Sequence, residues 1–468
     1  MILIKKVEAI FMSKTKVVIV GASHGGHQSI LELLKRYDDV DIKLFEAGDF
    51  VSFMSCGMEL YLENSVTDVH DVRNFKPDDF SANENVQILN NHEVTKINAD
   101  KKVISVVNTK DNSTQEYPYD KLILSSGVTS KSLPIPGNDL KNVFLMRGFD
   151  WATQIKAKLE DKNVKNITVV GAGYIGIEAA EASVKAGKNV TLLDVIDRPL
   201  GTYLDKEMTD ILEKHLEDKG VKVVTGAKIQ EYTGTNAVTS VKTDQTEYPS
   251  DLVIQAAGVK PNTDWLKGTI DLDDRGWIKT NEYLQTNQKD IYAIGDATLA
   301  YSIPANNHVP IALATVARRE ARYVVKHLFE KKPALPFSGV VGSSALSVFD
   351  YHFAESGLNS FTAQRSNVEI KSSFYQGSLR PAYVPAGKDN PTVSVQLFFN
   401  PTSHVLLGGA VLSTYDITAQ GNVLALAIQH KLTVEDLADA DFFFQPGFDR
   451  QWSILNVAAQ HALGEKDF

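Results

Sequence analysis

Residues 167–176 read Ile-Thr-Val-Val-Gly-Ala-Gly-Tyr-Ile-Gly, and this stretch decides the fold. A β-branched run leads into a Gly-x-Gly-x-x-Gly turn, and helix-forming residues follow from Ile177 to Ala186. Strand, glycine turn and helix in this register are typical of a dinucleotide-binding fold, in which the start of the helix binds the pyrophosphate. The dinucleotide-binding residues predicted here are Gly171, Gly173, Tyr174, Ile175 and Gly176.

An acidic residue follows this motif at the expected distance. The apolar pair Leu192-Leu193 ends in Asp194, 18 residues after Gly176. A carboxylate at this place accepts a hydrogen bond from a ribose 2′-hydroxyl and repels a 2′-phosphate. The sequence therefore favours NADH over NADPH, although the cation of the neighbouring Arg198 acts against this preference.

A second, less complete motif lies near the N-terminus. The β-branched run 16–20 precedes Gly21-Ala22-Ser23-His24-Gly25-Gly26, in which Ser23 replaces the middle glycine. A further strand pattern ends in Glu46, 20 residues after Gly26, where a carboxylate can accept from a ribose hydroxyl. The residues predicted to bind a second dinucleotide are Gly21, Ser23, Gly25, Gly26 and Glu46.

The chain repeats one plan twice. Two apolar runs end in glycine, at Gly127 and Gly258, and residues 291–296 add a strand pattern that ends in Gly-Asp. One nucleotide fold interrupted by another explains this order. We therefore predict an α/β protein with two nested Rossmann-like dinucleotide-binding domains and an α+β C-terminal domain. The expected parts are an N-terminal extension (1–13), the first fold (14–135 and 264–336), the second fold (136–263) and the C-terminal domain (337–468).

The C-terminal part differs in character from the two nucleotide folds. Alternating strand patterns at 347–349, 393–399 and 405–409 are followed by helix patterns at 417–428 and 434–438. The chain then carries an aromatic cluster, residues 442–448 with Trp452. Aromatic residues at this density form either a core or a subunit interface.

Cys56 is the only cysteine of the chain. No intramolecular disulfide is possible, so redox chemistry at sulfur uses one thiolate that cycles with its own oxidised form or with a thiol brought in by a ligand. Residues 58–62 read as the first turn of a helix, whose free N–H groups favour the thiolate. A lone cysteine is usually a small buried hydrophobe, but two dinucleotide motifs favour a redox role.

Composition bounds the class of protein. The length of 468 residues suggests about three domains, and 43% hydrophobic residues are enough for large cores. The net charge of −10 is spread without like-charge blocks, which argues against nucleic-acid and anionic membrane partners. No apolar run of ~18 residues could span a bilayer, residues 1–11 lack the order of a signal peptide, and a single cysteine fits a reducing cytosol. We expect a cytoplasmic protein without a metal site.

Several features together resemble the flavoprotein disulfide reductase superfamily: the nested folds, S-F-M-S-C-G-M at 52–58, I-G-D-A at 294–297 and F-F-F-Q-P at 442–446. The chain looks like the single-cysteine branch of NADH peroxidases, NADH oxidases and coenzyme A disulfide reductases, over nearly its whole length from residue 14. The resemblance implies FAD in the first fold, with Asp296 on the ribityl chain, and NADH in the second. It also implies a homodimer or higher homo-oligomer in which the partner's residues 444–446 lie near the flavin. Further predicted cofactor-binding residues are Ser55, Gly127, Ala297 and Gly258.

The resemblance also implies a mechanism. NADH gives hydride to FAD, and the reduced flavin gives two electrons to Cys56 held as a sulfenic acid, which leaves thiolate and water. The thiolate then attacks hydrogen peroxide and regenerates the sulfenic acid. His24 would stand near the sulfur and hydrogen-bond an attacking or leaving oxygen, although a histidine in such a turn is as often a capping or packing residue.

Residues 314–322, Ala-Thr-Val-Ala-Arg-Arg-Glu-Ala-Arg, bear on the choice between peroxide and oxygen. Peroxidase-like members resemble A-T-x-A-R here, with the arginine near the active cysteine, whereas oxidases tend to place their only arginine one residue later. This chain has both Arg318 and Arg319. Against the peroxidase pattern, Gln28 stands where peroxidases carry a glutamate that pairs with the arginine. The alternative for Arg318 is a solvated helix charge.

We therefore predict an FAD-dependent NADH peroxidase that reduces hydrogen peroxide to water, with Cys56, His24 and Arg318 as catalytic residues. The first alternative is a water-forming NADH oxidase that reduces O2. The second is a coenzyme A disulfide reductase, whose substrate needs basic residues around its nucleotide. A reading from a different class is an electron-transfer flavoprotein with Cys56 as packing, which the absence of a charged docking block disfavours.

Overall fold

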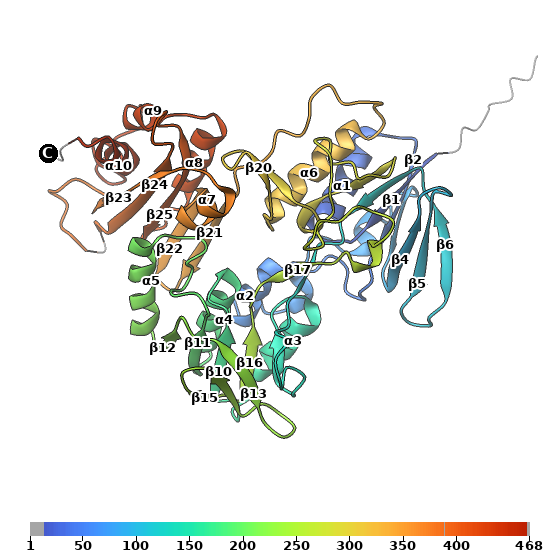
Figure 1. Cartoon of the computed structure of the whole chain (residues 1–468), viewed down its shortest axis with the longest axis horizontal. Coiled ribbons are helices and arrows are strands. Elements are labelled where there is room, and N and C mark those ends of the chain that lie inside the picture. The colour runs from blue at the N-terminus through green and yellow to red at the C-terminus, as the bar shows by residue number, and fades with distance from the viewer. Residues whose placement is uncertain (1–13, 388, 466–468) are drawn as a thin grey trace, which may run out of the picture.

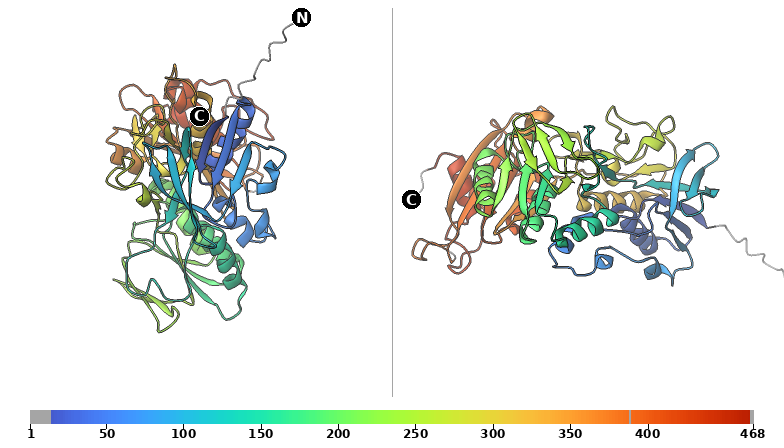
Figure 2. Two further views of the ribbon diagram at one scale, coloured as in Figure 1. Left: turned by 90° about the vertical axis from the view of Figure 1, so that its right-hand side faces the viewer. Right: turned by 90° about the horizontal axis from the view of Figure 1, so that it is seen from below.

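The structure is a computed structural model that describes residues 14–387 and 389–465. It has three lobes, each built around its own five-stranded sheet (Figure 1). The first fold and the C-terminal domain form the two ends of the long axis, as the view from below also shows (Figure 2). The predicted N-terminal extension, residues 1–13, lies outside the described residues.

The first fold is built on a parallel sheet with the strand order β18-β7-β1-β2-β3. Its strands are β1 (Thr15–Val20), β2 (Val40–Phe45), β3 (Val86–Leu89), β7 (Lys121–Leu124) and β18 (Ile291–Ala293). β18 pairs with β7 in parallel although residues 125–290 separate them. The sheet is therefore complete only after the chain has built the second fold, and this is the predicted nesting.

Alternate side chains of this sheet pack against different layers. Ile19 and Ile123 pack against two helices on one face, whereas Val18 and Leu122 pack against an antiparallel sheet on the other. Burial on both faces explains why these strands read as continuous apolar runs. The covering elements are α1 (His24–Arg36), α6 (Ala314–His327), β4 (His92–Asn98), β5 (Val103–Asn108) and β6 (Thr114–Pro118).

The second fold repeats this plan with the parallel strand order β12-β11-β10-β16-β9. Its strands are β9 (Val143–Leu145), β10 (Asn166–Val170), β11 (Asn189–Leu193), β12 (Val221–Val224) and β16 (Leu252–Gln255). Around them lie α3 (Phe149–Glu160), α4 (Tyr174–Lys185), α5 (Lys206–Asp218), β13 (Ile229–Thr233), β14 (Ser240–Thr243) and β15 (Glu247–Pro249). The chain enters and leaves this fold through β8 (Val128–Ser130) and β17 (Val259–Pro261), which pair antiparallel.

The C-terminal domain is built on an antiparallel sheet with the order β21-β22-β25-β24-β23. One face, with Val395 and Leu397, packs against the domain's own helices α8 and α10. The other face, with Phe353 and Leu412, packs into the core of the second fold beside α4. Its elements are β21 (Ser343–Val348), β22 (Tyr351–Gly357), α7 (Ser360–Ser366), β23 (Lys371–Ser378), β24 (Thr392–Phe399), β25 (Leu406–Ser413), α8 (Ala419–Gln429), α9 (Val434–Ala438) and α10 (Ile454–Ala462).

Four of the five elements predicted in this domain have different bounds in the structure. The strands expected at 393–399 and 405–409 span Thr392–Phe399 and Leu406–Ser413. The strand expected at 347–349 begins at Ser343 and ends at Val348, because Phe349 adopts a φ of 51° in the turn that follows. The helix expected from Ile417 begins at Ala419. Periodicity locates such elements well and their ends poorly, since ends depend on local turn geometry.

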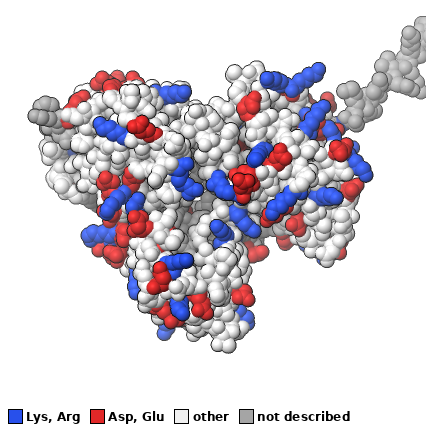
Figure 3. Space-filling view, in the orientation of Figure 1, with Lys and Arg blue, Asp and Glu red and all other residues white. Residues whose placement is uncertain are grey.

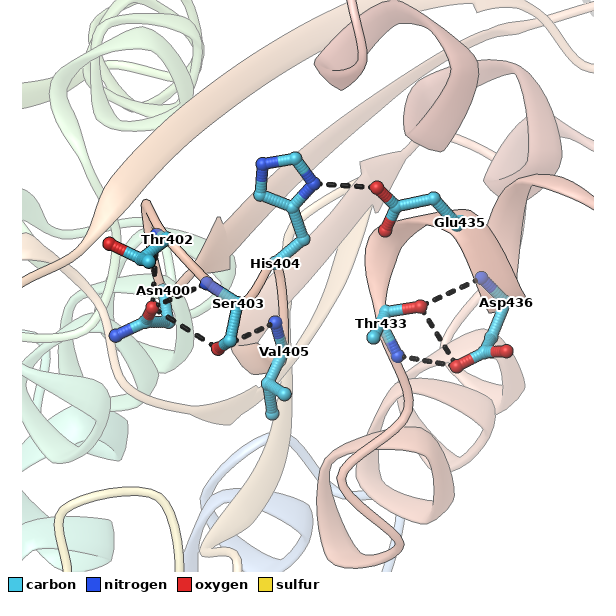
Figure 4. Close-up of polar contacts among 8 residues, drawn as sticks. All are labelled: Asn400, Thr402, Ser403, His404, Val405, Thr433, Glu435 and Asp436. Carbon is cyan, nitrogen blue, oxygen red and sulfur yellow. Dashed lines mark hydrogen bonds and ion pairs between the residues drawn. The ribbon is translucent and has the colours of Figure 1, made fainter.

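The turn between β24 and β25 is tied to the start of α9 (Figure 4). Nδ1 of His404 lies 2.6 Å from Oε1 of Glu435. The Thr433 hydroxyl accepts from the backbone N–H of Asp436, whose carboxylate accepts in return from the backbone N–H of Thr433. Such a capping box satisfies two N–H groups that a helix start otherwise leaves free. The turn and the helix start therefore hold each other in place.

The predicted fold class is confirmed. Two nested Rossmann-like folds and an α+β domain are present, while the domain boundaries and the dimerisation role of the third domain stay predictions. Acidic and basic side chains are interspersed over the face shown in Figure 3. Within residues 14–387 and 389–465, no helix has the length and apolar character needed to cross a membrane.

The close approach of α4 to β10 requires glycine at position 176. A Cβ there would overlap the carbonyl oxygen of Gly171. We expect Gly176→Ala to lower the free energy of unfolding by about 1–3 kcal/mol through overpacking, measured by chemical unfolding. Gly173→Ala is the matched control, because its φ is −81° and its Cβ would first meet Tyr203 at 3.5 Å. Equal losses in both variants would contradict the steric argument.

Candidate active site

The lone cysteine lies beside a histidine from the first glycine turn. Cys56 is in the 3-10 turn η1 (Ser55–Gly57), directly before the short helix α2 (Met58–Leu62), and His24 is the first residue of α1. Sγ of Cys56 is 3.8 Å from Nε2 of His24. The structure thus brings together two of the three predicted catalytic residues. Cys56 retains an exposed surface.

Neighbouring groups both raise and lower the pKa of the Cys56 thiol. Burial by neighbouring protein atoms raises the pKa of Cys56, and the charge of Glu178 raises it further. The backbone N–H of Cys56 and the cations Arg147 and Arg318 lower the pKa. The backbone N–H at this helix start favours the thiolate, but burial is the larger effect, so the pKa of Cys56 is raised overall.

His24 is electrostatically suited to stay neutral. Burial lowers its pKa, and the charges of Arg318 and Arg147 lower it further. Since an unperturbed histidine has a pKa of about 6.5, the ring is neutral at pH 7 and offers one donor and one acceptor nitrogen. Nε2 faces the sulfur, and Nδ1 is buried without a hydrogen-bond partner among the described residues.

Arg318 projects from α6 toward the same turn but has neutral partners. Its Nη1 donates to Oε1 of Gln28 at 3.0 Å, and its Nη2 donates to Oδ1 of Asn74 at 2.7 Å. Nη2 also lies 3.5 Å from Nδ1 of His27. Burial, followed by the charge of Arg318, lowers the pKa of His27 to about 4. The guanidinium is therefore held in place without a carboxylate partner in the described part of the chain, and it is not a freely solvated helix charge.

The first glycine turn forms a cradle for a dinucleotide. Gly21 has a φ of 98°, and a Cβ on it would overlap the carbonyl oxygen of Ser125. At the end of β2, Oε2 of Glu46 accepts from the backbone N–H of Ala22 at 3.1 Å, and Oε1 accepts from Gly48 at 3.0 Å. Burial raises the pKa of Glu46. The glycine turn, where little side-chain bulk covers the backbone, fits the pyrophosphate of FAD. The Glu46 carboxylate, held in place beside the turn, fits the ribose.

Asp296 follows β18 in the 3-10 turn η5 (Gly295–Ala297). Nη2 of Arg147 lies 3.5 Å from its Oδ2, and burial raises the pKa of Asp296 while Arg147 opposes the rise. The backbone N–H of Gly295 donates at 2.6 Å to Oε2 of Glu320, a residue of α6 with no exposed surface. Burial raises the pKa of Glu320 to about 8. Glu320 therefore fixes the turn that carries Asp296.

The second glycine turn forms the same kind of cradle. Gly171 has a φ of 101°, and a Cβ there would lie 2.5 Å from the carbonyl oxygen of Ala256. Oδ2 of Asp194 accepts from the backbone N–H of Ala172 at 2.6 Å, and Oδ1 accepts from Ile196 at 2.9 Å. These residues fit NADH in the way the first cradle fits FAD. Nη1 of the neighbouring Arg198 lies 3.3 Å from Asp197, so a carboxylate faces the cation that argued against NADH.

The remaining predicted cofactor residues lie around these cradles. Ser23 and Gly173 precede the first residues of α1 and α4, and Tyr174 and Ile175 begin α4. Gly127 and Gly258 follow β7 and β16, with φ values of 64° and 97°. Their contacts with cofactor stay predictions, as do the catalytic roles. The other predicted positions are Gly25 and Gly26 in the first turn of α1, Gly176 in the first turn of α4, Ser55 in η1 and Ala297 in η5.

Sequence reasoning missed Asn74, Arg147, Glu178 and Glu320. Arg147 stands in a stretch without a motif, and Asn74 lies in a polar loop, so neither gives a signal. Glu320 gives one in retrospect, because it is an acid on the apolar face of α6, beside buried Val316, Ala317 and Ala321. A carboxyl group on such a face needs a specific partner.

The aromatic cluster of the C-terminal domain is not core within this chain. Phe443, Phe444, Phe448 and Trp452 are 69%, 44%, 62% and 53% exposed. Exposed aromatic residues at this density mark interaction surfaces. Of the two interpretations of the cluster, the structure therefore favours an interface.

Known proteins resemble the chain along its whole length. Residues 15–321 match the family described as pyridine nucleotide-disulphide oxidoreductase. The chain is 37% identical over 450 residues to an NADH oxidase of Enterococcus faecalis, covering 96% of this chain and 99% of that protein. It is 29% identical over 453 residues to an NAD(P)H coenzyme A polysulfide/persulfide reductase of Pyrococcus horikoshii, covering 96% and 98%.

A solved structure gives the same result. The water-forming NADH oxidase from Lactobacillus brevis, bound to NADH, superposes with a TM-score of 0.91 at 34% identity, covering 96% of this chain and 98% of that one. The predicted superfamily is thereby confirmed. The chain belongs to the pyridine nucleotide-disulphide oxidoreductase family and is an NADH-dependent flavoprotein oxidoreductase with FAD and NADH as its cofactors.

Proposed function

We propose that this protein is a water-forming NADH oxidase, which oxidises two NADH for each O2 and releases two H2O. The observation that carries this proposal is the likeness over almost the entire chain to the Lactobacillus brevis enzyme, at a TM-score of 0.91. The relative from Enterococcus faecalis is also an NADH oxidase. Sequence analysis placed NADH peroxidase first, and these likenesses support its first alternative instead.

The hydrogen-bond partners of Arg318 also support an oxidase over a peroxidase. The resemblance to peroxidases pairs this arginine with a glutamate, whereas here its Nη1 donates to the neutral amide oxygen Oε1 of Gln28 at 3.0 Å. Asn74 and His27 are its other contacts. The charge of Arg318 is therefore not neutralised by an ion pair and acts on Cys56 and His24.

In the proposed mechanism two electrons from the first NADH and two protons reduce O2 to hydrogen peroxide, and Cys56 carries out the second half of oxygen reduction. The cradle of Gly21, Gly26 and Glu46, with Asp296, would hold FAD, which would supply a hydride acceptor for NADH and an electron donor for the oxidant. The Cys56 thiolate attacks one oxygen of hydrogen peroxide, so that an S–O bond forms, the O–O bond breaks and hydroxide leaves. Two electrons from a second NADH and one proton then convert the sulfenic acid to thiolate and water.

Two residues assist this cycle. Neutral His24 holds the peroxide oxygen next to the sulfur through Nε2, which lies 3.8 Å from Sγ. Arg318 lowers the pKa of Cys56 against the effect of burial. The Arg318 cation thus offsets part of the rise in the pKa of Cys56 that burial causes.

A coenzyme A-dependent reductase is the second candidate. A cleft of about 620 Å³ between α6 and α8 carries Arg319, Arg322 and Lys326, which are exposed. These are basic residues of the kind that the nucleotide part of coenzyme A needs and that sequence alone did not place. The test is intact-protein mass spectrometry of the purified enzyme, in which coenzyme A linked to Cys56 supports this candidate.

The exposed aromatic cluster suggests how subunits assemble. Burying Phe443, Phe444 and Trp452 against a second copy would remove a large apolar surface from water. The proposal therefore includes a homodimer or higher homo-oligomer formed through the C-terminal domain. It also keeps the cytoplasm as the compartment, because the single cysteine forms no disulfide.

Stoichiometry tests the proposed reaction. With excess O2 we expect two NADH consumed per O2, measured by absorbance at the NADH band together with an oxygen electrode, and no accumulation of hydrogen peroxide. The reaction should stop under nitrogen. Rapid anaerobic NADH oxidation driven by added hydrogen peroxide, with slow oxygen consumption, would restore the peroxidase interpretation.

Replacing the Cys56 thiol should stop the reaction after O2 has been reduced to hydrogen peroxide. Cys56→Ser changes little volume, so the fold and FAD binding are expected to persist. Without a thiolate, the variant should consume one NADH per O2 and release hydrogen peroxide, which a peroxidase-coupled dye detects. A variant that still consumes two NADH per O2 and releases no peroxide would show that Cys56 is not the site of the second reduction.

Removing the Arg318 cation should make the thiol less acidic. Because Arg318 lowers the pKa of Cys56, Arg318→Gln should raise it and slow alkylation of the reduced enzyme by iodoacetamide at pH 7 by about threefold, as for one charge in a water-like medium. The curve of alkylation rate against pH should move to higher pH. Arg319→Gln, an exposed neighbour of the same charge, is the control. Faster alkylation in Arg318→Gln would contradict the assignment.

A further inference from the structure

A hydrogen-bond chain joins the C-terminal domain to the second dinucleotide turn. Tyr174, the first residue of α4, places its hydroxyl 2.8 Å from Oγ of Ser344 in β21. Ser344 donates to Oε1 of Glu355 in β22 at 2.8 Å, and the Tyr174 hydroxyl lies 3.4 Å from the same oxygen. Ser344 and Glu355 are direct cross-strand partners. None of the cofactor or catalytic predictions includes these two residues.

In this hydrogen-bond chain the hydroxyls of Tyr174 and Ser344 donate, and Oε1 of Glu355 accepts. Burial raises the pKa of Tyr174 well above its ordinary value, and the charge of Glu355 adds to the rise, so the phenol keeps its proton. Burial raises the pKa of Glu355 to about 7, and its Oε1 accepts from the Ser344 hydroxyl, while the Tyr174 hydroxyl contacts both Ser344 and the same Glu355 oxygen. Tyr174, Ser344 and Glu355 are thus in mutual hydrogen-bond contact, and this cluster holds the Tyr174 ring from outside the second fold.

The ring that is fixed in this way borders the glycine turn. Tyr174 stacks on Tyr203 with ring centroids 4.2 Å apart, and Phe353 meets its edge at 5.5 Å. Tyr203 in turn lies against Gly173, whose Cβ would be 3.5 Å from the Tyr203 ring. Tyr174 and Tyr203 thus form an aromatic wall beside the middle glycine of the NADH motif.

We propose that Ser344 and Glu355 are positioning residues for NADH, which hold Tyr174 and the Tyr174–Tyr203 wall in the orientation that the dinucleotide meets. The proposal rests on NADH binding in the second fold and does not depend on which oxidant follows. Preorganising the wall removes an ordering cost from binding, so its loss weakens NADH affinity and leaves the rate of hydride transfer from bound NADH nearly unchanged.

The neighbouring cross-strand pair provides a matched control. Ser343 and Ser356 are paired one residue further along the same two strands, and Oγ of Ser356 donates at 2.9 Å to Oγ of Ser343 or to the carbonyl oxygen of Gly421. Because side chains alternate along a strand, this pair faces α8, away from Tyr174. Ser343→Ala therefore removes a comparable hydroxyl from the same strand and leaves the hydrogen bonds of Tyr174, Ser344 and Glu355 intact.

The experiment is anaerobic stopped-flow reduction of the flavin in the holoenzyme at increasing NADH concentration. Ser344→Ala and Glu355→Ala should raise the apparent Kd for NADH by about 5- to 10-fold, the order expected for one lost hydrogen bond, and change the limiting rate less than twofold. Glu355→Gln, which keeps an acceptor oxygen, should recover most of the affinity. Ser343→Ala should resemble the wild type.

Tyr174→Phe gives an independent measurement, because it keeps the ring and the stack and removes only the hydroxyl. It should raise the Kd as much as Ser344→Ala does, and the double variant should show no further rise. The proposal is overturned if the Kd is unchanged in Ser344→Ala and Tyr174→Phe, if the limiting rate falls by the same factor as affinity, or if Ser343→Ala weakens binding equally. An enzyme that proved to be a peroxidase would leave this test unaffected, since no oxidant is present.

Discussion

The contact between the first turn of a helix and the carbonyl that ends the preceding strand determines the rest of this structure. It occurs twice, where Gly26 packs on Gly21 and where Gly176 packs on Gly171. Only a residue without a Cβ allows the helix to begin so close to the strand. The helix N–H groups then point into a space with little side-chain bulk, and the acid at the end of the next strand accepts from the turn itself, Glu46 from Ala22 and Asp194 from Ala172.

The first of these turns also supplies the chemistry at sulfur. Because α1 begins at His24, the turn that cradles one cofactor places an imidazole 3.8 Å from Cys56. Helix α6, which packs beside α1, carries Arg318, whose guanidinium donates to Gln28 of α1. Burial and Glu178 make the thiol less acidic, whereas two arginines make it more acidic, so the reactivity of the sulfur is set by a balance of opposing charges.

Sequence was informative wherever the physical cause is local. A glycine turn, the strand before it and the acid after it lie within about thirty residues, and their spacing is dictated by backbone geometry. Both cradles, the nesting and the fold class were therefore predictable. The partners Asn74 and Arg147 were not, because they meet Arg318 and Asp296 through tertiary packing that no local pattern records. The same limit explains why the order of peroxidase and oxidase was reversed, since that choice depends on side-chain surroundings.

The pairing of β18 with β7 has a consequence for how the polypeptide is made. On a ribosome, β1, β2, β3 and β7 leave the exit tunnel long before residues 291–293, so the edge of β7 that receives β18 is open while the second fold is synthesised. The second fold has all of its strands between residues 143 and 255 and can complete its sheet first. Asp296 follows β18, so the cradle predicted to hold the flavin is complete only after the inserted domain has been synthesised. A nascent chain therefore presents every strand of the second sheet before the last strand of the first, and closure over residues 125–290 adds an entropic cost to pairing β18 with β7.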